Sequence, residues 1–485
     1  MEKKKEYGKF LIAALQVCLV AAFPAIFLYC RNADQADFYE IVPALLLFCG
    51  MGLFLLLCSL IVTRSSEKAV ISATILTLVM TNFSFLESLL KLPFPYIKYW
   101  HAMPIILVIA LHIVWLIFKF LDKDLLAEIA KVVGLVFGVL VMLNIVMSVP
   151  KIITRIEAKQ ELNAIDQAQQ NVNVVEGENK KPNIYLLLFD EYANFPQMEE
   201  YYGYDNAPLR EFLDQYNFNV SYPSQNESVN TVTIITNLVN LDYIVEDETT
   251  TDAEKEVLRK NGALYSLLKE YGYDIQTIET GDFLSDNSIG ASSQKNQAGT
   301  VNGETLAYLA INKSVFYPFY TLSVADTVKD VVNLANYIAS DEFVISDGNT
   351  FTMIYFLFPP QPFVVDEDGN PISVSHSVDW EDNQYYLGQY KYATKLMLPM
   401  VENIIEKDPN AVILLQSDHG ARAAGADSKP SGKFTFEAMK NPLNAVYFAG
   451  EELNIEGLSS VNTLRTILNK TLGTDLAMLS VPEYP

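Results

Sequence analysis

Two apolar segments of the sequence end in side chains that can bind a metal ion. Ala411–Leu415 is followed, two residues later, by the adjacent carboxylate and imidazole of Asp418 and His419, and Asn183–Phe189 ends in Asp190. Because parallel strands present their carboxyl ends at one edge of a sheet, both segments can aim oxygen and nitrogen ligands at one point. The sequence therefore predicts a metal site that contains Asp190, Asp418 and His419.

A third segment supplies a candidate nucleophile. The polar residues Ser228–Asn230 lead into the apolar helical stretch 231–238, which places the Thr231 hydroxyl at or near a helix amino terminus. The helix dipole and the free N–H groups at that end favour an alkoxide and the phosphate that it attacks. On composition alone, the favoured interpretation is that Thr231 merely caps that helix. A metal-assisted phosphoryl transferase needs hard ligands, an imidazole and a hydroxyl of this kind.

Short apolar strands alternate with amphipathic helices after residue 182. We expect strands at Asn183–Phe189, Asp274–Ile278, Phe351–Phe358, Ala411–Leu415 and Asn444–Ala449. We expect helices at Ala263–Tyr271, Tyr385–Glu406 and Ser460–Leu472. This alternation predicts a doubly wound α/β domain with a mostly parallel central sheet.

The first third of the chain is typical of a membrane anchor. Five apolar stretches, near 9–30, 41–63, 69–90, 103–120 and 129–149, are each about as long as the ~20 residues that a helix needs to cross a bilayer. We therefore predict a five-span helical anchor over 1–150, a juxtamembrane helix and linker over 151–182, and an α/β domain over 183–485.

The basic residues of the short loops predict the orientation of this anchor. One side carries Lys3, Lys4, Lys5, Lys9, Arg64, Lys68, Lys119, Lys123 and Lys131, and the other carries Arg31, Lys91 and Lys98. The richer side is expected to face the cytoplasm, so an odd number of spans places the α/β domain outside the cell.

Charge and cysteine content exclude two classes of protein. The formal net charge is −24, which argues against nucleic acid as a partner. The cysteines lie in or beside the first two predicted spans, at Cys18, Cys30, Cys49 and Cys58. The α/β domain therefore has no disulfide framework, and it has no Cys/Ser-X-Pro-X-Arg motif of the kind from which sulfatases make formylglycine.

Six segments in order resemble a known superfamily. They are Pro182–Ala193 (PNIYLLLFDEYA), Thr231–Ile244 (TVTIITNLVNLDYI), Tyr355–Asp368 (YFLFPPQPFVVDED), Tyr385–Leu396 (YYLGQYKYATKL), Ala411–Arg422 (AVILLQSDHGAR) and Val461–Thr474 (VNTLRTILNKTLGT). Together they are similar to the membrane-anchored, sulfatase-like branch of the alkaline phosphatase superfamily, which includes lipoteichoic acid synthases and phosphoethanolamine transferases. The lipoteichoic acid synthases share the arrangement of five spans followed by an outer catalytic domain.

The resemblance implies both an activity and roles for individual residues. It implies that Asp190, Thr231, Asp418 and His419 bind the metal, and that Thr231 also forms a covalent phospho-threonine intermediate. The reaction would be transfer or hydrolysis of a phosphodiester, such as a phospholipid headgroup or an envelope glycan or polymer, at the surface of a bacterial cell membrane. Arg422 would neutralise charge on the transferred group, or would instead pair with carboxylates at the surface.

Two positions depart from the pattern of the relatives. The loop Pro359–Phe363 lacks the histidine that contacts substrate in the relatives, and His376 is a candidate to replace it as a general acid or substrate contact. Glu191 stands where a small residue is usual. It is a candidate for an extra metal ligand or for a partner of a ligand. An acid next to another acid at the end of a strand is, however, more often solvated. Because this histidine is missing, the alternative that the protein is catalytically silent and binds a surface polymer remains.

The donor set predicts one metal ion. Too few histidines are present for a two-zinc site. Two carboxylates, a threonine oxygen and one imidazole are mostly hard ligands, so we expect Mn²⁺, with Mg²⁺ or Zn²⁺ as alternatives. The oligomeric state is not predicted.

Overall fold

The chain folds into two compact units. The computed structural model describes residues 2–34, 36–94, 97–169, 181–245, 249–280, 292–293, 306–320, 325–372, 382–422 and 438–482. We call residues 1–156 with 304–323 the helical unit, and residues 157–303 with 324–485 the α/β unit.

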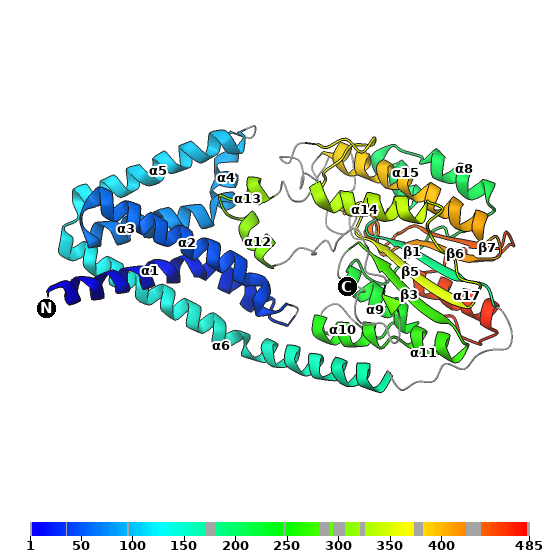
Figure 1. Ribbon diagram of the computed structural model, residues 1–485. Helices are drawn as coiled ribbons and strands as arrows, with labels where there is room; N and C mark the ends of the chain where they lie inside the picture. The colour runs from blue at the N-terminus through cyan, green and yellow to red at the C-terminus, as the bar shows by residue number, and fades with distance from the viewer. Residues whose placement is uncertain are drawn as a thin grey trace. The chain divides into compact units, whose positions relative to one another are not determined.

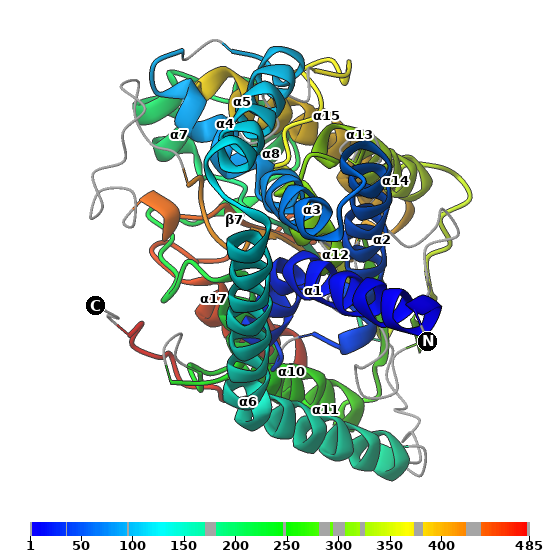
Figure 2. The same cartoon turned by 90° about the vertical axis from the view of Figure 1, so that its left-hand side faces the viewer.

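The helical unit is built from apolar helices (Figures 1 and 2). They are α1 (Glu2–Arg31), α2 (Phe38–Thr63), α3 (Ser66–Thr81), α4 (Phe83–Lys91), α5 (Tyr99–Phe120), α12 (Leu306–Asn312), α13 (Tyr317–Tyr320) and the part of α6 (Lys123–Gln169) up to residue 156. Within the described residues, four helices are long and apolar enough to cross a membrane, or five if α3 and α4 form one span. The predicted helical membrane anchor is confirmed in this form.

The third predicted span, 69–90, is two helices. α3 and α4 are bent by 69° relative to each other at their junction. At this junction the Asn82 side chain donates to the carbonyl oxygen of Leu78 at 2.9 Å, and such a contact competes with the backbone hydrogen bonds that would continue the helix. In α4, Glu87 is buried and lies 3.5 Å from the Lys91 ammonium.

A segment from far along the sequence packs among these helices (Figure 2). We call residues 306–320 the docking segment. Its α12 shares an apolar core with α1 and α2, formed by Leu306, Ala307, Ala310, Ile311, Ala21, Ala25, Ile41, Ala44 and Phe48. The Tyr99 hydroxyl donates to the carbonyl oxygen of Val315 at 2.7 Å, and the Ser84 N–H donates to that of Lys313 at 3.1 Å. The helical unit is therefore completed by residues that follow α6 by more than a hundred positions.

The α/β unit is a mixed sheet between helices (Figure 1). Its strands are β1 (Ile184–Phe189), β2 (Asn219–Val220), β3 (Asp274–Glu279), β4 (Ser292–Ser293), β5 (Thr350–Phe356), β6 (Val412–Ser417) and β7 (Asn444–Phe448). Its helices are α7 (Phe195–Tyr202), α8 (Ala207–Gln215), α9 (Thr231–Asn240), α10 (Asp252–Lys260), α11 (Ala263–Glu270), α14 (Ala325–Ile338), α15 (Asn383–Lys407) and α17 (Ser460–Leu472).

The described strands form one sheet in the order β2-β7-β6-β1-β5-β3-β4. The pairs from β6 through β4 are parallel, and β7 runs antiparallel to both of its neighbours. The mostly parallel α/β fold that the strand and helix pattern predicts is confirmed.

The central strand β1 is buried on both faces. Leu186 and Leu188 belong to an apolar core with α9, α11 and α17, whereas Leu187 and Phe189 belong to the core with α8, α14 and α15. Burial of one such side chain stabilises the fold by about 1.5–3 kcal/mol. Asp190, the residue that follows β1, is therefore attached to a strand that is buried on both faces.

Candidate metal centre

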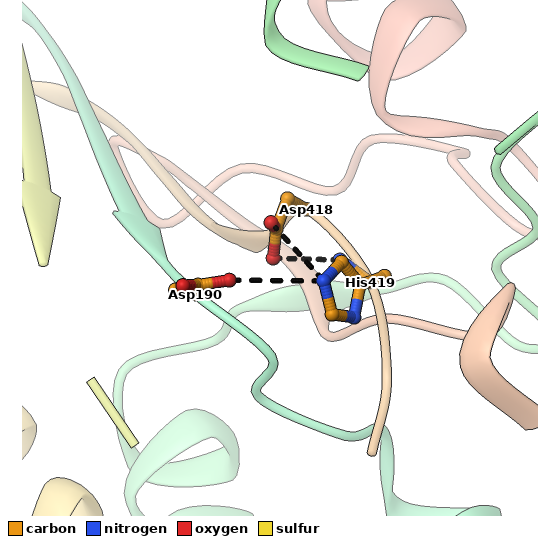
Figure 3. Close-up of side chains that lie close together, drawn as sticks. All are labelled: Asp190, Asp418 and His419. Atoms are coloured by element: carbon orange, nitrogen blue, oxygen red, sulfur yellow. Dashed lines mark hydrogen bonds and ion pairs between the residues drawn. The ribbon is translucent and has the colours of Figure 1, made fainter. Parts of the chain in front are cut away.

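Two neighbouring parallel strands deliver the predicted carboxylates to one point (Figure 3). Phe189 at the end of β1 pairs with Ser417 at the end of β6. Asp190 and Asp418 therefore leave the sheet side by side, and both are buried, with exposed fractions of 5% and 0%. The Asp190 N–H also donates to the carbonyl oxygen of Phe356 on β5 at 3.0 Å, which fixes its backbone.

The imidazole of His419 completes the cluster. Its Nε2 lies 3.7 Å from Asp190 Oδ1 and 3.6 Å from Asp418 Oδ2 (Figure 3). Donor atoms about 2.1 Å from an ion lie about 3.4 Å apart in a tetrahedral site. Asp418 Oδ2 is buried and has no hydrogen-bond partner among the described residues. A buried oxygen of this kind is costly unless a cation or donor meets it, so the cluster fits a divalent ion.

The backbone around His419 sets its tautomer. His419 Nδ1 lies 2.8 Å from the carbonyl oxygen of Gly420. A carbonyl oxygen only accepts, so Nδ1 carries the proton and Nε2 presents its lone pair to the cluster. A side chain at position 420 would place its Cβ 2.7 Å from the carbonyl oxygen of Ala438, so this close approach requires glycine.

Thr231 is the first residue of α9 and faces this cluster. Its hydroxyl oxygen lies 3.5 Å from both Asp190 Oδ1 and His419 Nε2. The helix cap is Asn230, whose side-chain oxygen accepts from the Thr233 N–H at 3.1 Å. The alternative that Thr231 itself caps the helix is therefore wrong, because the preceding residue fills that position. Thr231 is only half-buried, whereas the three cluster side chains are buried.

The two carboxylates hold their protons differently. Burial, the neighbouring Asp418 and Glu191 raise the pKa of Asp190 well above its usual range, and Arg422 opposes that rise. Burial also disfavours ionisation of Asp418, but His419, Asp190, Thr231 and the Glu191 N–H together lower the pKa of Asp418. Binding of a divalent cation would favour the ionised form of both acids.

Glu191 is buried and paired with Arg422. Its exposed fraction is 0%, so the expectation that such an acid is more often solvated is wrong here. Oε1 accepts from the Arg422 N–H at 2.7 Å, and Oε2 lies 3.3 Å from Arg422 Nη1. The sheet register explains this burial, because the residues after β1 pack against the loop after β6 instead of turning into solvent.

Three further side chains support the cluster, and the sequence pattern alone does not identify them. The Tyr355 hydroxyl bonds the carboxylate of Asp190. Asn226 Nδ2 donates to the carbonyl oxygen of Asp418 at 2.7 Å, and Ser417 Oγ donates to that of His419 at 2.7 Å. Tyr355 lies opposite Leu188 on the neighbouring strand. A correct prediction of the pairing between β5 and β1 would therefore have placed Tyr355 near Asp190.

The remaining predicted site residue, His376, is outside the described residues. Gln389 contacts the histidine-free loop, since its Nε2 donates to the carbonyl oxygens of Pro359 at 3.0 Å and Pro360 at 2.8 Å. The structure thus brings together Asp190, Thr231, Asp418 and His419, with the Arg422–Glu191 pair beside them.

No protein-family model and no curated protein matches the chain. Solved structures do. Over 95% of both chains, it is similar to the integral membrane protein lipooligosaccharide phosphoethanolamine transferase A from Neisseria meningitidis, with 10% identity and a TM-score of 0.39. Over 64% of this chain and 77% of the other, it is similar to a lipoteichoic acid synthase from Listeria monocytogenes, with 13% identity and a TM-score of 0.38.

A third similarity is to the C-terminal periplasmic domain of EptC from Escherichia coli in complex with zinc. It covers 61% of this chain and 84% of the other, with 13% identity and a TM-score of 0.37. These proteins are of the kinds that the sequence motifs resemble. At such scores the likeness assigns no role to a side chain.

Proposed function

We propose that the protein is a metal-dependent phosphotransferase or hydrolase that acts on a phosphodiester through Thr231. One observation carries the proposal: a half-buried hydroxyl at a helix amino terminus lies 3.5 Å from two members of a buried Asp/Asp/His cluster. A hydroxyl that only capped a helix would not need such neighbours.

Asp190, Asp418, His419 and the Thr231 hydroxyl would hold one divalent ion. When bound, the ion supplies positive charge that lowers the pKa of the hydroxyl and offsets negative charge on the phosphoryl group. The hard donors favour Mn²⁺, as the sequence predicts. The donor atoms lie 3.5–3.7 Å apart, close enough to meet at one ion, and Mg²⁺ and Zn²⁺ are the alternatives to Mn²⁺.

The proposed reaction has two steps. The Thr231 oxygen attacks phosphorus in line, and the bond from phosphorus to the leaving alcohol breaks as the new P–O bond forms. Water or an acceptor alcohol then attacks the phospho-threonine and releases Thr231. α9 begins at Thr231, so its amino terminus would lie next to the attacked phosphate, and the helix dipole favours negative charge there.

Two further residues have proposed roles in this reaction. Arg422 contacts oxygens of the transferred group, because its side chain remains 43% exposed beside the cluster. His376 donates a proton to the leaving alcohol or contacts substrate in place of the histidine missing from the loop at 359–363.

The helical unit supports a substrate from the membrane or the cell envelope. Up to five apolar spans and the excess of basic residues in the loops on one side would place the α/β unit outside the cytoplasm of a bacterium. A phospholipid headgroup as donor and an envelope glycan, lipid or water as acceptor are consistent with that placement.

Turnover by the full-length protein tests the proposal. The purified protein in detergent is stripped with a chelator and given Mn²⁺, Mg²⁺ or Zn²⁺ with bis(p-nitrophenyl) phosphate, and separately with phospholipid in mixed micelles. Metal-restored cleavage or transfer supports the proposal. A protein that binds the metal but is inert on both substrates would instead be a catalytically silent surface-binding protein.

A further inference from the structure

The pair formed by Glu191 and Arg422 is not needed to build the metal cluster. Both members are near site residues in the sequence: Glu191 is one position after Asp190, and Arg422 is three positions after His419. Neither side chain belongs to the cluster of Asp190, Asp418 and His419. Yet Glu191 is completely buried, and it holds Arg422 at two points, one on the backbone and one on the guanidinium.

The backbone at Glu191 is held in an unfavourable conformation. Its φ is 52°, in the left-handed region that side chains other than glycine rarely adopt. Two hydrogen bonds hold it there: its N–H donates to Asp418 Oδ1 at 2.8 Å, and its carbonyl oxygen accepts from the Tyr386 hydroxyl at 2.7 Å. The same residue is thus bonded to a cluster carboxylate through its backbone and to Arg422 through its side chain.

The exposure of the pair is asymmetric. Glu191 is 0% exposed and Arg422 is 43% exposed, so the acid is fixed inside the fold while the guanidinium reaches solvent. A guanidinium has five N–H donors in a planar fork, and the pair occupies only part of them. The guanidinium donors that bond none of the described residues match the oxygens of a phosphate or phosphodiester.

We propose that Glu191 is a positioning residue that fixes Arg422 to bind the non-bridging oxygens of the transferred phosphoryl group. This inference rests on the proposed function, and it adds Glu191 as a residue that acts through Arg422. A purely structural salt bridge, which only joins the ends of β1 and β6, is the competing account.

A double-mutant cycle separates the two accounts. The variants are Glu191→Gln, which keeps an acceptor for the Arg422 N–H but loses the charge, Arg422→Ala, and the double variant. Glu367→Gln is the matched control, because Glu367 pairs with Lys391 at 2.6 Å on the surface. The probes are the affinity of the full-length, metal-loaded protein for inorganic phosphate, its affinity for the metal alone, and kcat and KM on bis(p-nitrophenyl) phosphate.

We expect Arg422→Ala to weaken phosphate binding by about tenfold and Glu191→Gln by about three- to tenfold, with metal affinity retained. In the Arg422→Ala background, Glu191→Gln should have no further effect, because its role is exerted through Arg422. The control should match wild type. A full additional loss in the double variant, or a loss of metal affinity that explains the phosphate effect, would overturn the inference.

The phosphate measurement also distinguishes failure of this inference from failure of the proposed function. If wild type turns over no phosphodiester but binds phosphate in a manner that depends on Arg422 and Glu191, the proposed reaction is wrong and the positioning role stands. If the metal-loaded wild type binds no phosphate, the positioning role is wrong.

Discussion

The hydroxyl oxygen of Thr231 lies 3.5 Å from Nε2 of His419, although the two residues are 188 positions apart in the sequence. α9 supplies the hydroxyl and the loop after β6 supplies the imidazole. The Gly420 carbonyl oxygen turns the lone pair of the ring toward the hydroxyl. This relationship makes Thr231 part of the cluster rather than part of the helix cap.

Metal affinity should depend on the charge of Asp418. Asp418→Asn keeps the shape of the side chain but removes the buried anion, so we expect divalent-ion affinity to fall by about a hundredfold or more. Asp408→Asn is the control, since Asp408 accepts a hydrogen bond from Asn183 at the other end of the sheet. Titration of the stripped protein with Zn²⁺ and Mn²⁺ by calorimetry checks this, and equal affinity in the two variants would contradict it.

Metal affinity should also rise with pH. The pKa of Asp190 is raised by burial and by Asp418, so this acid holds its proton above the usual range in the metal-free protein. The ion must displace that proton, and the competition weakens as the pH rises. Calorimetry in buffers of different ionisation enthalpy should detect proton release on binding, and binding without release would contradict the assignment of Asp190 as a ligand.

Removing the Tyr355 hydroxyl should weaken the metal site without unfolding the sheet. Tyr355→Phe keeps the buried ring on β5 and deletes the hydrogen bond to Asp190. Loss of such a partner of a ligand costs about tenfold or more in metal affinity. Tyr447→Phe is the control, because its hydroxyl donates to the carbonyl oxygen of Pro409, away from the cluster. An unchanged affinity in Tyr355→Phe would show that Asp190 does not depend on this bond.

Glu191 should make the metal-free protein less stable as the pH rises toward neutrality. Burial raises its pKa from 4.5 to about 7, although Arg422 and His419 oppose this. Between these values the folded state binds more protons than the unfolded state, so the free energy of unfolding falls as the pH increases. Chelator-treated wild type should therefore lose stability from about pH 4.5 to pH 7, and Glu191→Gln should show a flatter curve in chemical denaturation. Parallel curves would contradict this.

The docking segment should contribute measurably to the helical unit. Tyr99→Phe leaves the carbonyl oxygen of Val315 without its 2.7 Å donor, which costs about 1 kcal/mol or more. Tyr39→Phe is the control, since Tyr39 is 71% exposed. Thermal unfolding of both variants in detergent checks the difference. Equal melting temperatures would show that this bond adds nothing to the packing of the segment.

The sequence predicts most of the elements that position the site. β6 was expected at Ala411–Leu415 and spans Val412–Ser417, and α17 has the predicted bounds Ser460–Leu472. Strands at the centre of a parallel sheet are buried on both faces, so their apolar runs are plain in the sequence. Acids placed directly after two such runs could therefore be expected to meet.

What the sequence does not reveal depends on contacts between distant segments. The burial of Glu191 requires the loop after β6 to lie over the end of β1, and the role of Tyr355 requires the pairing of β5 with β1. The docking segment is a further case, because α12 is short and its partners lie in α1 and α2. Local periodicity carries no information about such partners.

Detection of a phosphoryl group on Thr231 tests the central claim most directly. The full-length protein, loaded with metal, is incubated with bis(p-nitrophenyl) phosphate or phospholipid, quenched in acid and analysed by peptide mass spectrometry. We predict an adduct on Thr231 that requires metal and is absent from Thr231→Ala, whose turnover falls by about a thousandfold or more. Asn230→Ala should lose about 1 kcal/mol of stability with the loss of the cap, yet still form the adduct. Metal-dependent turnover that persists in Thr231→Ala, or an adduct on another residue, would contradict the account.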